Sequence, residues 1–163
     1  MELLRIYLQD HLASATGAVE LARRAHGSNR GSEFGPGLAA VHELLTDDRA
    51  ALLDAMRRLG VDPDRLKVCA AWAAEKAGRL KLNGSVRSYS PLSRVVELEG
   101  LGLLLLGQRR LWETLDRVLA GDPRMAGFGA AARTTQVDDA LARLADLHAR
   151  AVAVAFPLPS PAS

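Results

Sequence analysis

The chain has 163 residues, of which 48% are hydrophobic and 4% aromatic, and its formal net charge at pH 7 is +2. This length suits one hydrophobic core and is short for two domains, while abundant Ala and Leu and few β-branched runs favour helix over sheet. So small a charge excess does not by itself indicate a nucleic-acid partner. We therefore predict an all-α protein in which residues 1–156 form a single helical bundle domain.

The first predicted helix covers about residues 2–26, because apolar positions recur there every three or four residues. Its inward stripe consists of Leu4, Leu8, His11, Ala15, Ala18 and Ala22. A polar loop with several glycines follows, from residue 27 to residue 37. This helix therefore presents one histidine among small and apolar residues.

The second predicted helix covers about residues 37–59. Its stripe consists of Leu38, Val41, Leu45, Asp48, Leu52, Ala55, Met56 and Leu59, and Gly60 supplies the C-terminal stop. Asp62 as N-cap and Pro63 at the first helical position begin a third helix, which ends near residue 82 at an Asn-Gly pair.

Ser90 and Pro91 repeat the same starting signal for a fourth helix that reaches about residue 119. A loop rich in Gly and Ala covers residues 124–133, after which Thr134 or Thr135 caps the last helix. The inward positions of that helix are Val137, Leu141, Leu144, His148, Ala151 and Val152. Prolines at positions 157, 159 and 161 forbid its continuation, so we predict a disordered Pro-rich tail over residues 157–163.

Four of these helices each carry one ionisable residue on the predicted inward stripe: His11, Asp48, Glu99 and His148. Burying such groups is costly unless they are paired, hydrogen-bonded or bound to a metal. If the first helix rises and the second descends, His11 and Asp48 lie about 14 and 17 Å above the lower end. The four residues therefore nominate a polar layer inside the bundle.

The direction of the fourth helix decides whether Glu99 joins this layer. Strict alternation of five helices makes the fourth descend and places Glu99 about twenty residues above the lower end, outside the layer. A long crossover that contains the third helix, with the fourth helix rising and the fifth descending, places all four residues about 12 to 17 Å up. We adopt the crossover.

Two antiparallel helix pairs joined by a long crossover resemble the ferritin-like four-helix bundles, over about residues 2–156. This resemblance implies an all-α, ferritin-like four-helix bundle with a helical crossover, five helices in total. Its di-iron members carry a carboxylate on two helices and Glu-x-x-His on the other two. No Glu-x-x-His occurs in this chain, so the resemblance is to the architecture and not to the di-iron site.

Only some of the positions that match the ferritin-like ligands carry a residue that can bind a metal. Glu99 stands for the third-helix carboxylate and His148 for the last histidine, but Ala145 replaces the glutamate three residues before it. On the second helix the corresponding pair is Leu45 and Asp48, and on the first His11, or Asp10 beside it, replaces the usual Glu. What remains is a single site for Fe, Mn or Zn on His11, Asp48, Glu99 and His148. The alternative is a structural network in which Glu99 pairs with Arg94, Arg110 or His11.

The function we expect is that of a non-catalytic bundle that acts as a homo-oligomer or on a protein partner. The leucines between positions 101 and 106 cover more than one helix face, so another subunit is expected to bury part of that surface. A metal-binding or redox bundle is the alternative. A third possibility is that the basic segment 54–94, which has nine basic and four acidic residues, binds nucleic acid or an acidic partner. A solvated helix face explains that charge better than binding does.

Several features bear on where the protein works. The most apolar run, residues 98–107, contains a glutamate and three glycines and is far shorter than the ~20 residues that span a bilayer. The N-terminus lacks the basic and apolar regions of a signal peptide, and the single cysteine, Cys69, excludes an internal disulfide. We expect a cytoplasmic protein without a membrane segment.

Overall fold

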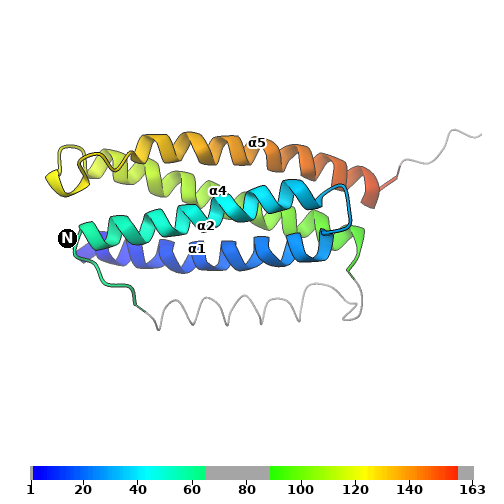
Figure 1. Cartoon of the computed structure of the whole chain (residues 1–163), viewed down its shortest axis with the longest axis horizontal. Helices are drawn as coiled ribbons and strands as arrows, with labels where there is room; N and C mark the ends of the chain where they lie inside the picture. The colour runs from blue at the N-terminus through cyan, green and yellow to red at the C-terminus, as the bar shows by residue number, and fades with distance from the viewer. Residues whose placement is uncertain (1, 65–88, 158–163) are drawn as a thin grey trace, which may run out of the picture.

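A computed structural model describes residues 2–64 and 89–157 of the chain. Within these ranges there are four long helices, α1 (Glu2–Asn29), α2 (Gly35–Arg58), α4 (Pro91–Val118) and α5 (Ala130–Ala155), and one short 3-10 helix, η1 (Pro123–Met125). No strand occurs among the described residues, so the all-α prediction is confirmed. Figure 1 shows the four helices side by side along the long axis of the molecule. Residues 65–82 of the predicted third helix and 158–163 of the predicted tail lie outside the described residues.

Helix α1 continues three residues beyond the predicted end. Its last residue, Asn29, is buried, and its side-chain Nδ2 donates to the carbonyl of Ala25 at 2.8 Å. That bond gives a carbonyl of the last turn a side-chain donor in addition to the backbone of the helix. The predicted loop thus begins later because Asn29 points into the bundle and its side chain engages the last turn.

Helix α2 ends as the sequence predicts, at a glycine. Gly60 has φ +71°, a left-handed conformation that costs a residue without Cβ little. The Gly60 N–H donates to the carbonyl of Arg57 at 3.1 Å, and the Val61 N–H donates to that of Met56 at 2.9 Å. These two bonds form a Schellman motif, and the buried Val61 side chain anchors the turn on the core.

The chain after α2 is held by a polar side chain of α1. Gln9 is buried, and its Nε2 donates to the carbonyl of Asp62 at 2.5 Å. Its Oε1 accepts from the N–H of Asp64 at 2.8 Å. Both ends of this amide are therefore satisfied by backbone, which fixes the chain just before residue 65.

Helix α4 begins at the predicted cap. The Ser90 Oγ accepts from the Ser93 N–H at 3.1 Å, while the Ser93 Oγ accepts from the Ser90 N–H at 3.4 Å, so the two serines form a reciprocal capping box. Pro91 supplies the preset φ of the first helical residue. The predicted ends of this helix are confirmed to within one residue.

Helix α5 begins five or six residues earlier than predicted. Its N-cap is Gly129, with φ +74°, and the helix continues through three alanines, which have the highest helix propensity. Thr134 and Thr135 do not cap it. Their hydroxyls donate within the helix to the carbonyls of Ala130 and Ala131, each at 3.5 Å. The left-handed conformation of Gly129 thus determines where α5 begins, and the threonine side chains do not.

The direction predicted for the fourth helix is wrong. The Tyr7 hydroxyl near the start of α1 bonds Thr114 near the end of α4 at 3.2 Å. Near the other end of the bundle, Arg24 of α1 pairs with Glu97 of α4 at 2.9 Å. Helix α4 therefore runs antiparallel to α1 and in the same direction as α2, as the colour progression in Figure 1 also shows.

The core lies between all four helices and is made mainly of leucine and alanine. Its largest fully buried side chains on the helices are Leu8, Leu12, Leu38, Leu45, Leu52, Met56, Leu98, Leu101, Leu105, Leu111 and Trp112, and α5 adds Val137 and Leu144. Gly100 faces Leu21 of α1, where an added Cβ would lie 3.3 Å from that side chain. A close helix contact at a glycine is thus present between α1 and α4.

Candidate functional site

The four residues of the predicted polar layer separate into three places. Because α4 descends, Glu99 lies in the half of the bundle where α1 ends, and His11 and Asp48 lie in the other half. Glu99 is exposed, and only Asp48 is buried. The buried positions of α4 include Leu98, Leu101 and Leu105, so the inward stripe passes beside Glu99. The residues around Glu99 are apolar on all faces of the helix, so their periodicity does not show which face is inward. Glu99 directly follows the buried Leu98 and was assigned to the wrong face.

Glu99 and His148 form a surface pair between α4 and α5. The His148 Nε2 lies 3.3 Å from the Glu99 Oε1, and both side chains are well exposed to solvent. Water screens such a pair, so its contribution to stability is small. The pair holds neighbouring helices in register without enclosing a site.

His11 is packed against an aromatic ring of its own helix. The rings of His11 and Tyr7 have centroids 4.4 Å apart and are tilted by 59°. Burial lowers the pKa of His11, because removing water disfavours the imidazolium, although the carboxylate of Asp10 acts in the opposite direction. The imidazole is therefore mainly neutral at pH 7 and can be partly buried without a counter-charge.

Asp48 is the one nominated carboxyl group inside the core. Its Oδ1 accepts from the indole Nε1 of Trp112 at 2.7 Å. Burial raises the pKa of Asp48 to about 6, and Asp47 adds to the rise, whereas the Trp112 hydrogen bond and the charge of Arg133 lower it. Among the described residues, the Asp48 Oδ2 and the Oε1 of Gln108, one turn before Trp112, have no hydrogen-bond partner. A buried carboxyl group thus depends on a single side-chain donor.

Trp112 is enclosed by the loop between α4 and α5. Its ring lies 5.8 Å from that of Phe128, and the guanidinium of Arg58 lies 5.5 Å from the centre of the Phe128 ring. Arg58 also donates to the carbonyl of Ala126 at 3.3 Å. This stack closes one end of the bundle over the Asp48 and Trp112 pair.

The nominated metal ligands do not gather. In residues 2–64 and 89–157 no group of three or more His, Cys, Asp or Glu side chains is placed to hold a metal ion. The expected pairing of Glu99 with Arg94, Arg110 or His11 is also absent from the polar contacts of the described residues. Glu99 contacts His148, while Arg94 and Arg110 bond other residues. Binding of Fe, Mn or Zn by the four residues stays a prediction that these positions do not support.

A second polar cluster, which the sequence did not reveal, lies where α1 ends and α4 begins. The Asn29 Nδ2 donates to the Tyr89 hydroxyl at 2.7 Å, and that hydroxyl donates to the Glu97 Oε2 at 3.0 Å. The Arg94 Nε donates to the Asn29 Oδ1 at 2.7 Å, and Arg24 pairs with Glu97. Burial raises the pKa of Tyr89 to about 12. We name these five residues the Asn29 cluster.

The Asn29 cluster is stacked on an aromatic residue of the loop between α1 and α2. The Arg94 guanidinium lies 4.2 Å from the centre of the buried Phe34 ring, and Arg150 of α5 lies 5.2 Å from it. Arg150 also pairs with Glu33 at 2.5 Å. The cluster joins α1 to α4, Phe34 links it to Arg150 of α5, and these contacts are those of a structural junction.

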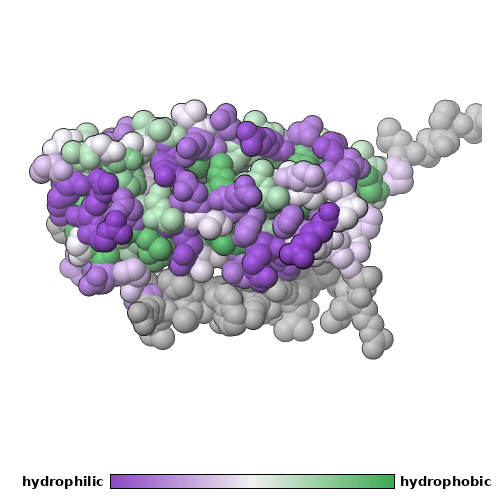
Figure 2. Space-filling view, in the orientation of Figure 1, coloured by the Kyte–Doolittle hydropathy of each residue, from purple (hydrophilic) through white to green (hydrophobic). Residues whose placement is uncertain are grey.

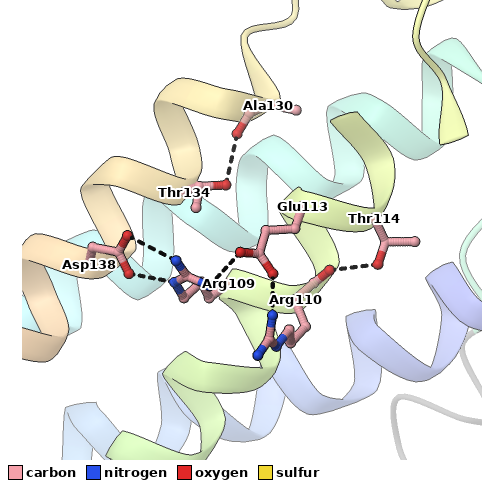
Figure 3. Close-up of polar contacts among 7 residues, drawn as sticks. All are labelled: Arg109, Arg110, Glu113, Thr114, Ala130, Thr134 and Asp138. Carbon is pink, nitrogen blue, oxygen red and sulfur yellow. Dashed lines mark hydrogen bonds and ion pairs between the residues drawn. The ribbon is translucent and has the colours of Figure 1, made fainter. Parts of the chain in front are cut away.

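Ion pairs also line the surface between α4 and α5. Figure 3 shows Arg109 of α4 between Asp138 of α5 and Glu113 of its own helix. The Arg109 Nε donates to Asp138 at 2.6 Å, and Arg110 donates to the other oxygen of Glu113 at 2.7 Å. These groups are partly or largely exposed, so they set the register of the two helices more than they stabilise them.

An apolar hollow of about 360 Å³ lies between the end of α4 and the start of α5. Its apolar lining includes Leu115, Leu119 and Phe128. Asp122 on its rim is engaged by Arg124, which holds the pKa of that carboxyl below its ordinary value. The hollow is thus mainly apolar, and one of the two carboxylates in its lining, Asp122, is already paired.

The surface feature that stands out is on the outward face of α4. Four large apolar side chains are exposed there, Leu92 by 50%, Val96 by 39%, Leu103 by 72% and Leu106 by 49%. Their spacing of four, seven and three residues places them on one side of the helix, opposite its buried positions. We name them the α4 stripe. By contrast, the face of the bundle in Figure 2 is mostly hydrophilic, with apolar residues in small separate patches.

Comparison with known protein families, with curated proteins and with solved structures finds no match to this chain. None of the helices in the described residues is both long enough and apolar enough to cross a membrane.

Proposed function

We propose that this protein is a non-catalytic helical bundle that acts by binding protein through the α4 stripe. The observation that carries the proposal is the exposure of Leu103, 72% of whose surface is open to solvent in the middle of a 28-residue helix. Large apolar side chains gathered on one exposed face are costly to hydrate and typically mark a surface that another protein covers. This exposure supports the expectation, drawn from the leucine run, that another protein covers part of α4.

The chemistry of the ionisable residues supports a binding role over a catalytic one. Asp48 is bonded to Trp112 in the core, His11 is packed on Tyr7, and the Asn29 cluster is internally hydrogen-bonded. Each set is explained by its structural partners. In the part of the chain that the structure describes, none of these residues is itself in the lining of the two hollows at the end of α4.

Helix directions support a ferritin-like connectivity, which we propose for the whole chain together with a fifth helix in the connection. Helices α2 and α4 run in the same direction, so the chain between residues 59 and 90 joins opposite ends of the bundle. One long crossover between two antiparallel helix pairs is the connectivity of ferritin-like bundles. A cytoplasmic location stays a prediction.

Photo-crosslinking tests the binding surface. Leu103 is replaced by p-benzoylphenylalanine in the full chain, and the same residue at the exposed Ala142 of α5 is the matched control. Irradiation of intact cells is expected to give a protein adduct from position 103 alone, which mass spectrometry identifies and which Leu106→Glu removes. Equal adducts from both positions, or none from position 103, would overturn the proposal.

A further inference from the structure

We propose that the occupant of the α4 stripe is a second copy of this chain, bound antiparallel about a two-fold axis that passes between positions 103 and 106. The inference rests on the proposed function and names its partner. The outward face of α4 reads Leu92, Val96, Glu99, Leu103, Leu106 and Arg110, with alternating spacings of four and three residues. This is the spacing with which one helix packs along another.

The order of charges on this face selects the arrangement of the two copies. Glu99 precedes Leu103 by four residues, and Arg110 follows Leu106 by four. In an antiparallel pair centred between the leucines, Leu103 faces Leu106 of the partner subunit and Glu99 faces Arg110 of the partner subunit. In a parallel pair each charge faces its own copy and repels it. The face is therefore complementary to itself in one orientation only.

Both charged groups are available for such a pairing. The Glu99 side chain is 55% exposed and that of Arg110 is 75% exposed. Their present partners, His148 and Glu113, belong to the same molecule. A partner subunit can add a second hydrogen-bonding group to each charge without removing the first.

A hollow on the same face fits the remaining apolar residues. It has a volume of about 350 Å³ and is lined by Arg110, Glu113, Thr114, Arg117 and Val118, near the end of α4. In the antiparallel register, Glu113 faces Val96 of the partner subunit and Arg117 faces Leu92 of the partner subunit. The apolar residues near the start of one α4 thus pack on the aliphatic stems of charged side chains near the end of the other, twice in each dimer.

Sedimentation equilibrium of the full chain tests this arrangement with two charge reversals. Glu99→Arg and Arg110→Glu place like charges opposite each other and are each expected to weaken dimerisation about tenfold or more. Mixing the two variants restores both opposite-charge pairs, so a heterodimer about as tight as the wild-type dimer is expected. Asp139→Arg and Arg143→Glu on α5 introduce the same charges away from the face and should leave dimerisation unchanged.

The possible outcomes separate this inference from the proposed function. If the wild-type chain stays monomeric at every concentration, a second copy is not the occupant of the α4 stripe. Crosslinking from position 103 then still tests whether another protein binds there. Dimerisation that Leu103→Glu abolishes, but that mixing the charge variants fails to restore, overturns the antiparallel register and leaves the binding surface standing. The inference is supported if each charge variant alone dimerises weakly and the mixture of the two dimerises as tightly as the wild type. Circular dichroism checks that each variant is folded.

Discussion

The two halves of the bundle treat buried polar groups in opposite ways. Where α1 ends, the Asn29 amide uses both its oxygen and its nitrogen, and the Tyr89 hydroxyl bonds two partners. In the other half, Asp48 is held by Trp112 alone and its second oxygen has no partner among the described residues. Burial raises the pKa of an ionisable group in each half, that of Tyr89 to about 12 and that of Asp48 to about 6, but only Asp48 depends on a single hydrogen-bond donor.

This difference predicts which half is more sensitive to the loss of one hydrogen bond. In the Asn29 cluster water can replace a lost partner, because part of the cluster is exposed. Around Asp48 it cannot do so without entering a core of leucine and methionine. The four predictions below test this contrast, from the largest expected effect to the smallest.

Trp112→Phe is expected to lower the free energy of unfolding at neutral pH by about 3 kcal/mol, because it opens a cavity and leaves Asp48 without its donor. Urea denaturation measures this loss. The double variant Asp48→Asn with Trp112→Phe should lose less than the two single variants together, since no buried charge is then left unpaired. Additive losses would show that the hydrogen bond at 2.7 Å contributes little.

Asp48→Asn is expected to remove a pH dependence of stability. The carboxyl pKa is 3.8 in its ordinary state and about 6 in the fold, so the folded chain binds an extra proton between these values and loses stability as pH rises through them. The stability of the variant relative to wild type should therefore increase by about 2 kcal/mol between about pH 4.5 and about pH 7.5. A difference that does not change with pH would contradict the raised pKa.

Asn29→Ala is expected to lower the free energy of unfolding by about 1.5 kcal/mol, because Arg94 and Tyr89 each lose a partner. Tyr89→Phe removes only the hydroxyl and should cost about half as much. Both are measured by thermal or urea unfolding at neutral pH, and neither variant should change the slope of stability with pH near 6. A larger loss than that of Trp112→Phe would reverse the comparison between the two halves.

His148→Ala is expected to change stability by less than about 0.5 kcal/mol, because its pair with Glu99 is exposed and screened by water. Calorimetry of the two proteins in low and high salt checks this. A loss of several times this size, abolished by a chelator, would instead indicate that His148 binds a metal ion.

Much of the local structure could be predicted from residues close together in the sequence. Ser90 and Pro91 define the start of α4, and Gly60 defines the end of α2, because caps depend on side chains and φ angles within a few residues. The start of α5 could not be read in this way. A helix can begin near Thr134 or near Ala130. The left-handed conformation of Gly129 makes it begin at Ala130.

The candidate site was less predictable, because it depends on which helices face each other. Asp48 was correctly placed inward, but its partner is a tryptophan 64 residues later in the chain, which apolar periodicity does not pair with it. Asn29 looked like a loop residue until its contacts with Tyr89 and Arg94 were known. The stripe of exposed apolar residues on α4 was foreshadowed by its leucine run, although not its extent from Leu92 to Leu106.

The sequence by itself determined the helical class, most of the helix boundaries and the composition of the core, because propensity, capping and apolar periodicity act over one or two turns. Only the tertiary structure decided the direction of α4, since that depends on where a connection of some thirty residues delivers the chain and on which faces pack together. The direction of α4 separates Glu99 from Asp48 and His11. The four residues therefore do not form the polar layer that the sequence predicted.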